Sequence, residues 1–168
     1  KWGAVTRGER GEVGGRGYTD HQVSETAKKL LEDSEVTEMV TATPVSTHQA
    51  LAKQALQANK HVLDEKPMTS TTGEAEELIG LAGKKDLVLM VDHTFIYTGA
   101  VRKVKEMIEV GDLGELYYFD SLRVNLGLFP HDIDLIWDLA PHDLSILTYL
   151  IPDQPESVSS VDIVLTGL

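Results

Sequence analysis

The stretch VTEMVTATPVSTHQALAKQALQANKHVLDEK, residues 36–66, decides the fold. It opens on a short β-prone segment at 36–42 and continues with a segment at 47–59 whose apolar residues recur on one helical face. A short extended segment follows at 61–64. A strand, a helix and a strand in this order are typical of a right-handed crossover between parallel strands. The stretch therefore predicts an α/β fold with a parallel sheet.

The same alternation continues on both sides of this stretch. Upstream, apolar residues at helical spacing predict a helix from about Gln22. Downstream, Thr71-Thr72-Gly73-Glu74 has the pattern of a capping box before another helix, and 101–110 is helical again. Between them, the continuous apolar run at 87–91 predicts a strand buried on both faces of the sheet.

The two ends of the chain depart from this pattern. Residues 1–17 hold six glycines and no apolar periodicity, which predicts a flexible glycine-rich leader. Beyond Gly111 and Gly114, β-prone segments at 116–124 and 157–165 flank a helix expected at 138–150. This second half predicts the start of an α+β domain with a mostly antiparallel sheet.

Composition excludes several classes of protein. The 168 residues carry a formal net charge of −12, which argues against nucleic acid as the main partner because phosphate neutralisation needs a basic face. There is no cysteine, so a disulfide framework, a zinc ribbon, an iron–sulfur site and a cysteine nucleophile are excluded, and a reducing cytoplasm is expected. No apolar run approaches the ~18 residues that a membrane-spanning helix needs, so we expect no membrane partner.

The tripeptide Glu65-Lys66-Pro67 directly follows the strand expected at 61–64. Ligands of open parallel sheets bind at the carboxyl ends of the strands, so Lys66 is placed where chemistry is common. A lysine beside a second cation or an apolar wall can serve as a proton donor or an acid/base group. An ordinary surface lysine in a turn is the simpler interpretation, and these three residues alone favour it.

A second candidate is the segment WDLAPHD at 137–143. Asp138 resembles a helix N-cap, and His142 lies four residues on, so the two share one helix face. A carboxylate beside an imidazole orients it as a general base requires. Capping by Asp138 and a local hydrogen bond of His142 is the alternative, which the segment alone favours.

The segment TATPVSTH at 41–48 joins a strand to a helix at the same edge of the sheet. Its hydroxyl groups and the helix N-terminus could face a ribose or a phosphate. Simple N-capping by Ser46 or Thr47 is the alternative.

A metal site is not expected, although potential ligands cluster in the second half. They lack the HxxH or HxxxH spacing of common metal motifs. The cluster consists of His131, Asp132, Asp134, His142 and Asp143.

Together these stretches resemble the Gfo/Idh/MocA oxidoreductase family, from about Tyr18 to the end. The motifs that carry the resemblance, in order, are ATPVSTH (42–48), KHVLDEKPMTST (60–71), LVLMVDHTF (87–95), GDLGELYYFDSLRVN (111–125) and WDLAPHDLSIL (137–147). The resemblance implies a partial Rossmann domain, parallel and doubly wound, at 18–112 that lacks its first βαβ unit. It implies that 113–168 begin an α+β domain with an open, mostly antiparallel sheet.

The resemblance also implies NAD or NADP as cofactor and hydride transfer to or from a hydroxyl-bearing carbon of a sugar, nucleotide sugar or cyclitol. Lys66, Asp138 and His142 match the catalytic positions: His142 would take the hydroxyl proton, Asp138 would orient His142, and Lys66 would polarise the oxygen. Lys66 also matches a position beside the cofactor, and Lys66 and His142 match positions that contact the substrate. The remaining matches are Thr43, Pro44, His48 and Glu65, which line the cofactor, and Arg123 and Asn125, which face the sugar.

The chain also departs from the family pattern. The glycine-rich G-x-G-x-x-G turn is absent, and Gly14-Gly15-Arg16-Gly17 has neither a preceding strand nor a following helix in this interpretation. The residue that selects between NAD and NADP is missing too, and Asp92 stands where a small residue is more typical. The absent glycine turn predicts no robust turnover by these residues alone. The resemblance further implies a homo-oligomer in a longer parent protein.

Two functional hypotheses remain open at this point. The first is an NAD(P)-dependent sugar dehydrogenase, which the intact proton-relay residues favour. The second is a non-catalytic fragment that serves only as a structural or ligand-binding module, which the missing phosphate-binding turn favours.

Overall fold

The computed structural model describes residues 2–6, 21–24, 27–123 and 135–161. Its centre is a five-stranded sheet in the order β2-β1-β3-β4-β5, and every pair of neighbouring strands is parallel. The prediction of a parallel α/β fold is confirmed, and the sheet is that of a partial Rossmann domain. The strands are β1 (Trp2–Thr6), β2 (His21–Ser24), β3 (Glu38–Ala42), β4 (His61–Asp64) and β5 (Leu89–Val91).

The beginning of the chain is not the leader that its glycine content predicts. Trp2–Thr6 pairs with β2 on one side and with β3 on the other, so β1 is an interior strand. The glycine content averaged over residues 1–17 gave no indication of this five-residue strand. Its backbone amide and carbonyl groups are satisfied by the two neighbouring strands. The first parallel strand pair is therefore present, whereas Gly14-Gly15-Arg16-Gly17 lies outside the described residues.

The helix expected from about Gln22 begins later. Residues His21–Ser24 form β2, and the helix α1 covers only Ala27–Glu32. Val23 fits the apolar helical spacing, but it pairs with Ala4 in the sheet. Pairing with an open strand edge outweighs a weak helical pattern in a segment this short.

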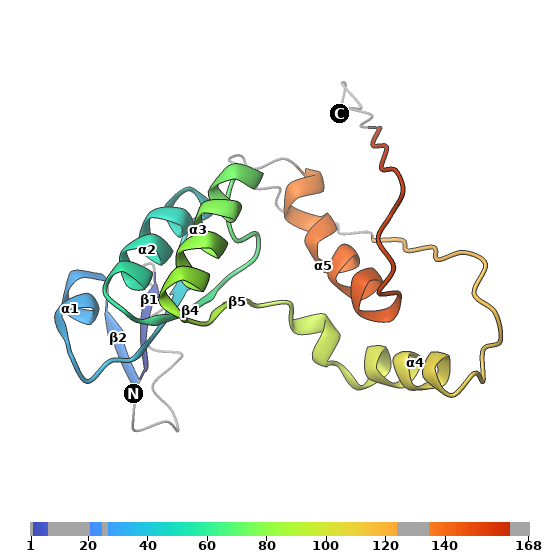
Figure 1. Ribbon diagram of the computed structural model, residues 1–168, viewed down its shortest axis with the longest axis horizontal. Coiled ribbons are helices and arrows are strands. Elements are labelled where there is room, and N and C mark those ends of the chain that lie inside the picture. Colours follow the sequence, from blue (N-terminus) through green and yellow to red (C-terminus); the bar gives the residue numbers. More distant parts are fainter. Residues whose placement is uncertain (1, 7–20, 25–26, 124–134, 162–168) are drawn as a thin grey trace, which may run out of the picture.

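Two further helices cover the sheet, α2 (Val45–Gln57) and α3 (Thr72–Lys85). They lie side by side in front of the strands in Figure 1. The capping box of α3 is confirmed, because the Thr71 hydroxyl accepts from the Glu74 amide while the Glu74 carboxylate accepts from the Thr71 amide. Two orphan amides at the start of α3 are thereby satisfied.

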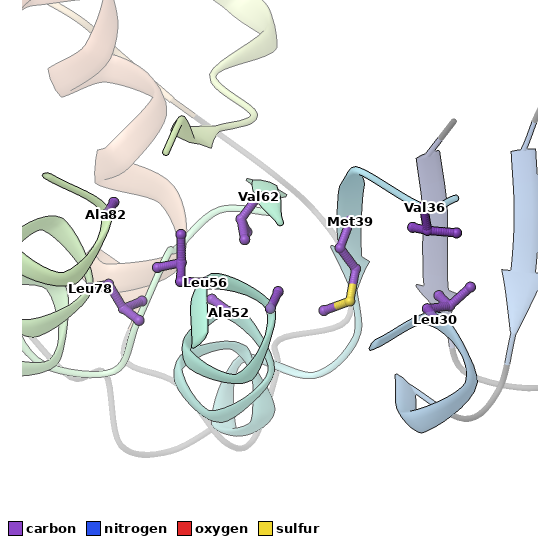
Figure 2. Packing of buried hydrophobic residues seen from close by; sticks show 9 residues of the cluster. Leu30, Val36, Met39, Ala52, Leu56, Val62, Leu78 and Ala82 are labelled. Atoms are coloured by element: carbon purple, nitrogen blue, oxygen red, sulfur yellow. The ribbon is translucent and has the colours of Figure 1, made fainter. Parts of the chain in front are cut away.

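One apolar core joins α1, α2 and α3 to one face of the sheet (Figure 2). Met39 of β3 and Val62 of β4 point into it from the strands, and Leu56 of α2 and Leu78 of α3 meet them from the helices. Side chains alternate between the faces of a strand, so Thr41 and Asp64 lie on the same face as Met39 and Val62. The alternation that builds the core thus buries two polar side chains at the carboxyl ends of β3 and β4.

The strand β5 is at the edge of the sheet and is not buried on both faces as its apolar run predicts. Among the described strands it pairs only with β4, and Met90 is 39 % exposed. An apolar run shows that a strand is suited to burial on both faces. Whether the strand is buried depends on its position in the sheet.

The second half of the described chain is helical. A 3₁₀ turn η1 (Thr94–Tyr97) leads into α4 (Gly99–Glu109), and both pack against α5 (Leu135–Leu150), to one side of the sheet in Figure 1. Gly111 and Gly114 follow the end of α4 with φ angles of +81° and +67°, which glycine adopts without strain. Within the described residues no helix is long and apolar enough to cross a membrane.

The strands expected at 116–124 and 157–165 are not formed where the structure describes these segments. Residues 116–123 and 157–161 are irregular, and Tyr117 and Tyr118 are 84 % and 86 % exposed. A β-prone segment becomes a strand only when another strand satisfies its backbone groups, and neither described segment pairs with one. The expected antiparallel sheet is therefore absent from the described residues, and the domain boundary between 112 and 113 stays a prediction.

Candidate active site

The loop that follows β4 carries Lys66, and the peptide bond from Lys66 to Pro67 is cis. The Lys66 ammonium donates to the Asp138 carboxylate over 2.7 Å and to the Asp138 carbonyl oxygen over 3.0 Å. Both side chains are 20 % exposed. A pair of charged groups this well shielded holds its geometry, because leaving either charge alone is costly. Lys66 is therefore not an ordinary surface lysine.

Asp138 is not the N-cap that the sequence predicts, because α5 already begins at Leu135. Its carboxylate lies in the first turn of α5, where a negative charge is favourable near the helix N-terminus. Asp138 pairs with Lys66, and among the described residues it makes no hydrogen bond to His142. In the structure Asp138 therefore fixes the position of the Lys66 ammonium and does not orient His142.

His142 lies one turn further along α5 and faces the same site. Its ring packs edge-on against Phe95 with 4.8 Å between the ring centroids, and its Nδ1 atom is buried without a hydrogen-bond partner among the described residues. Burial lowers the pKa of His142, and the positive charges of Lys66 and Arg123 lower it further. His142 is thus held in its neutral form, which is the form that can accept a proton.

The structure adds His93, which the motif analysis did not single out. It comes two residues after the end of β5, and its Nδ1 atom is also buried without a partner among the described residues. Burial lowers its pKa as well. The sequence signal that could have identified His93 is its position shortly after a parallel strand, where ligands of such sheets bind.

Arg123 lies beside His142 and is fixed by Asp143. The guanidinium forms a two-pronged pair with the Asp143 carboxylate, with distances of 2.8 and 3.1 Å, and it stacks over the Phe95 ring at 4.9 Å. The hydrogen bond from Arg123 lowers the pKa of Asp143, so this carboxylate stays ionised. Arg123 therefore contributes a positive edge to the site, whereas Asn125 lies outside the described residues.

The loop between β3 and α2 lies at the same edge of the sheet as Lys66. Pro44 occupies the N-cap position of α2 and offers no side-chain cap, so capping by Ser46 or Thr47 is wrong. The Thr47 hydroxyl instead donates back to the Pro44 carbonyl over 2.7 Å and bonds Thr43 over 2.7 Å. Glu65 is partly exposed next to this loop, and its amide donates to the Thr41 carbonyl over 3.1 Å.

His48 occupies a different environment from the other residues that match cofactor-lining positions. Its side chain is 1 % exposed, and both ring nitrogens face backbone carbonyl groups of the protein. Its neighbour Asp64 is fully buried and accepts a hydrogen bond from the Thr41 hydroxyl. Burial raises the pKa of Asp64 to about 6, against the opposing effects of Thr41 and His48.

A cavity of about 680 Å³ opens beside the site, between the Pro67 turn, η1 and α5. Its wall is mostly apolar and includes His93 and Trp137. The Trp137 indole donates to the Thr69 carbonyl over 2.8 Å, which is a second link between α5 and the loop that carries Lys66. The described residues contain no group of three side chains that could hold a metal ion, and His131, Asp132 and Asp134 lie outside them.

The chain matches known oxidoreductases over half of its length or more. Residues 9–93, half of the chain, match the family model described as "Oxidoreductase family, NAD-binding Rossmann fold". An uncharacterized oxidoreductase of Schizosaccharomyces pombe is 45 % identical over 101 residues, which are 60 % of this chain and 27 % of that protein. A UDP-N-acetylglucosamine 3-dehydrogenase of Acidithiobacillus ferrooxidans is 36 % identical over 132 residues, which are 77 % of this chain and 41 % of that enzyme.

Solved structures agree with these relatives. The crystal structure of an NAD-binding protein from Listeria innocua superposes with a TM-score of 0.65 at 27 % identity and covers 77 % of this chain and 40 % of that one. The chain thus spans less than half the length of these three relatives.

Proposed function

This chain belongs to the oxidoreductase family with an NAD-binding Rossmann fold, the Gfo/Idh/MocA family, and from that premise we propose that it serves as a nicotinamide-dependent dehydrogenase of sugars. The substrate class is a sugar, nucleotide sugar or cyclitol with a secondary hydroxyl group. The UDP-N-acetylglucosamine 3-dehydrogenase among its relatives supports a nucleotide-linked sugar. The observation that carries the proposal is the meeting of Lys66 and Asp138 beside a neutral His142.

The residues at the carboxyl edge of the sheet fit a dinucleotide. Parallel strands β3, β4 and β5 end at one edge, and the residues that follow them include Thr43, Lys66 and His93. The Nδ1 atoms of His93 and His142 have no partner among the described residues, which is typical of a site that gains one from a ligand, since buried polar atoms are otherwise paired. Thr43, Pro44 and Glu65 would border the cofactor, and Lys66 would lie beside its reactive end.

The proposed chemistry divides between the cofactor and three side chains. A bound nicotinamide supplies a carbon that accepts or returns hydride. In the oxidising direction His142 takes the hydroxyl proton as the carbon–hydrogen bond breaks and the carbonyl forms. Lys66 donates a hydrogen bond to the same oxygen, and Asp138 holds the Lys66 ammonium in place. Arg123 and Asn125 would face the remainder of the sugar.

Two measurements on a longer protein that contains this chain test the proposal, because no robust turnover is expected from these 168 residues alone. We expect that protein to bind NADH, detected by energy transfer from tryptophan, and to form NADH from NAD when UDP-N-acetylglucosamine is the first sugar tried. The His142→Ala and Lys66→Ala variants should lower kcat by about 100-fold or more, as loss of a general base or a proton-donating group does. A matched control is Lys53→Ala, because Lys53 pairs with Glu77 away from the site.

The outcomes separate the two functional hypotheses. A chain that binds neither NADH nor NADPH contradicts the proposal and favours a structural module. If the longer protein binds the dinucleotide but turns over no sugar, a ligand-binding module is favoured. Turnover that survives His142→Ala contradicts the role of His142 as the base.

A further inference from the structure

His48 belongs to a buried polar cluster that the proposed hydride transfer does not use. The His48 side chain and the Asp64 side chain are 1 % and 0 % exposed. Thr41 is buried beside them and donates its hydroxyl proton to Asp64. The cluster lies under the carboxyl ends of β3 and β4, directly below the two loops that carry Thr43 and Lys66.

The two ring nitrogens of His48 reach two different loops. Nδ1 lies 2.9 Å from the carbonyl oxygen of Pro67, in the loop after β4. Nε2 lies 2.8 Å from the carbonyl oxygen of Thr43, in the loop after β3. His48 is anchored itself, because it belongs to the first turns of α2, which packs into the core.

The chemistry of these partners specifies the protonation state of the ring. A carbonyl oxygen accepts hydrogen bonds and never donates them, so each ring nitrogen must carry a proton for both contacts to be hydrogen bonds. An imidazole with both nitrogens protonated is positively charged. The Asp64 carboxylate lies 3.5 Å from Nδ1 and supplies the opposite charge that a buried cation requires.

We propose that His48 is a positioning residue: as an imidazolium paired with Asp64, it ties the Pro67 carbonyl to the Thr43 carbonyl and so sets where Lys66 stands relative to the cofactor-binding loop. The inference rests on the proposed function for its effect on catalysis, but its charge state and its contacts do not depend on activity. It replaces the expectation that the His48 side chain lines the cofactor itself, because both its nitrogens are occupied by the protein.

Substitutions at His48 should separate positioning from folding. His48→Ala removes both contacts and leaves Asp64 as a buried charge without a cationic neighbour, so this variant is expected to be destabilised as well. His48→Gln keeps an amide donor in the same place without the charge, and the double variant His48→Gln, Asp64→Asn removes both charges together. The matched control is His61→Gln, because His61 also bonds a backbone group, the Val88 amide, but at the opposite end of β4.

The closing experiment is nitrogen NMR of this chain with labelled histidine, read together with kinetics of the longer protein that contains it. We expect His48 to show two protonated ring nitrogens near pH 7, both protected from exchange, whereas a neutral His48 with one bare nitrogen would overturn the proposal. In kinetics, His48→Gln should lower kcat about tenfold or more at a substrate KM within about threefold, and His61→Gln should change neither. A folded His48→Gln protein with unchanged kcat would also overturn the proposal.

The two readouts keep this inference apart from the proposed function. If the chain shows no turnover at all, the NMR spectrum still decides the charge and the contacts of His48. If the chain is active while His48 is neutral, the proposed function stands and the positioning role fails.

Discussion

The two regions of the molecule that meet at Lys66 and Asp138 are packed very differently. From α1 to α3 the chain has a core in which Leu30, Met39, Leu56 and Leu78 have no exposed surface. From α4 to α5 the only buried hydrophobic residue described is Leu150. The first region is held by apolar burial, whereas α5 is linked to it by polar contacts from Asp138 and Trp137. The candidate site therefore joins a rigid half to a half whose position depends on a few hydrogen bonds.

The largest effect that tests this comparison is on stability. Leu56→Ala, in the core, should lower the free energy of unfolding by about 2–5 kcal/mol, because it removes buried apolar surface and leaves a cavity. Leu144→Ala, in α5, should cost no more than about 0.5 kcal/mol, because Leu144 is 56 % exposed. Urea denaturation measures both, and equal losses would contradict the contrast between the regions.

A second stability effect comes from Asp64, at the edge of the core. Its pKa is raised to about 6 in the folded chain from 3.8, so the folded state binds the extra proton between these values. The stability that this proton confers is present below pH 3.8 and is lost as pH rises through about 6. Asp64→Asn should flatten this part of the stability curve, and Asp86→Asn, at the C-cap of α3, should leave it unchanged.

A third prediction concerns His142, on the loosely packed side of the site. Its pKa is lowered, so its protonation, and any fall in kcat/KM that depends on it, should begin below the ordinary value of 6.5. Arg123→Ala removes one of the cations that lower this pKa, so the titration of His142 followed by NMR should move to higher pH. Lys103→Ala serves as the control, because Lys103 is exposed on α4 and pairs with the exposed Glu106. A shift to lower pH in Arg123→Ala would contradict the assigned electrostatics.

The smallest predicted effect compares the starts of two helices. Thr71→Ala removes the capping box of α3 and should lower the free energy of unfolding by about 1 kcal/mol. Thr98→Ala affects the N-cap position of α4, where the side chain caps no amide, so a smaller loss is expected. Thermal unfolding of the two variants ranks them, and a larger loss for Thr98→Ala would reverse the conclusion.

Local patterns in the chain predicted several elements well. The strand at 61–64 and the capping box at 71–74 were placed correctly, because both are encoded by neighbouring residues. β1 and the edge position of β5 were not predictable in this way, because a strand is stabilised by partners distant in the sequence. For the same reason the β-prone segment at 116–124 looked like a strand and is irregular where it is described.

The candidate site shows the same division. The motifs point to Lys66, Asp138 and His142, and the helical spacing places the last two on one face of α5. Only the folded chain pairs Asp138 with Lys66, which is 72 residues away, and brings the unpartnered nitrogen of His93 into the same site. Spacing along a helix shows which residues share a face, but it does not identify the residue of another segment that packs against that face.

The sequence by itself determined the parallel α/β class, the family and the residue types available for proton transfer, because these depend on local periodicity and on short motifs. The tertiary structure decided which strands are interior, which carboxylate holds Lys66, and that His48 is buried between two loops instead of open to a ligand. The physical reason is that backbone pairing, burial and charge neutralisation each need a partner, and in a folded chain the partner is set by the packing of distant segments.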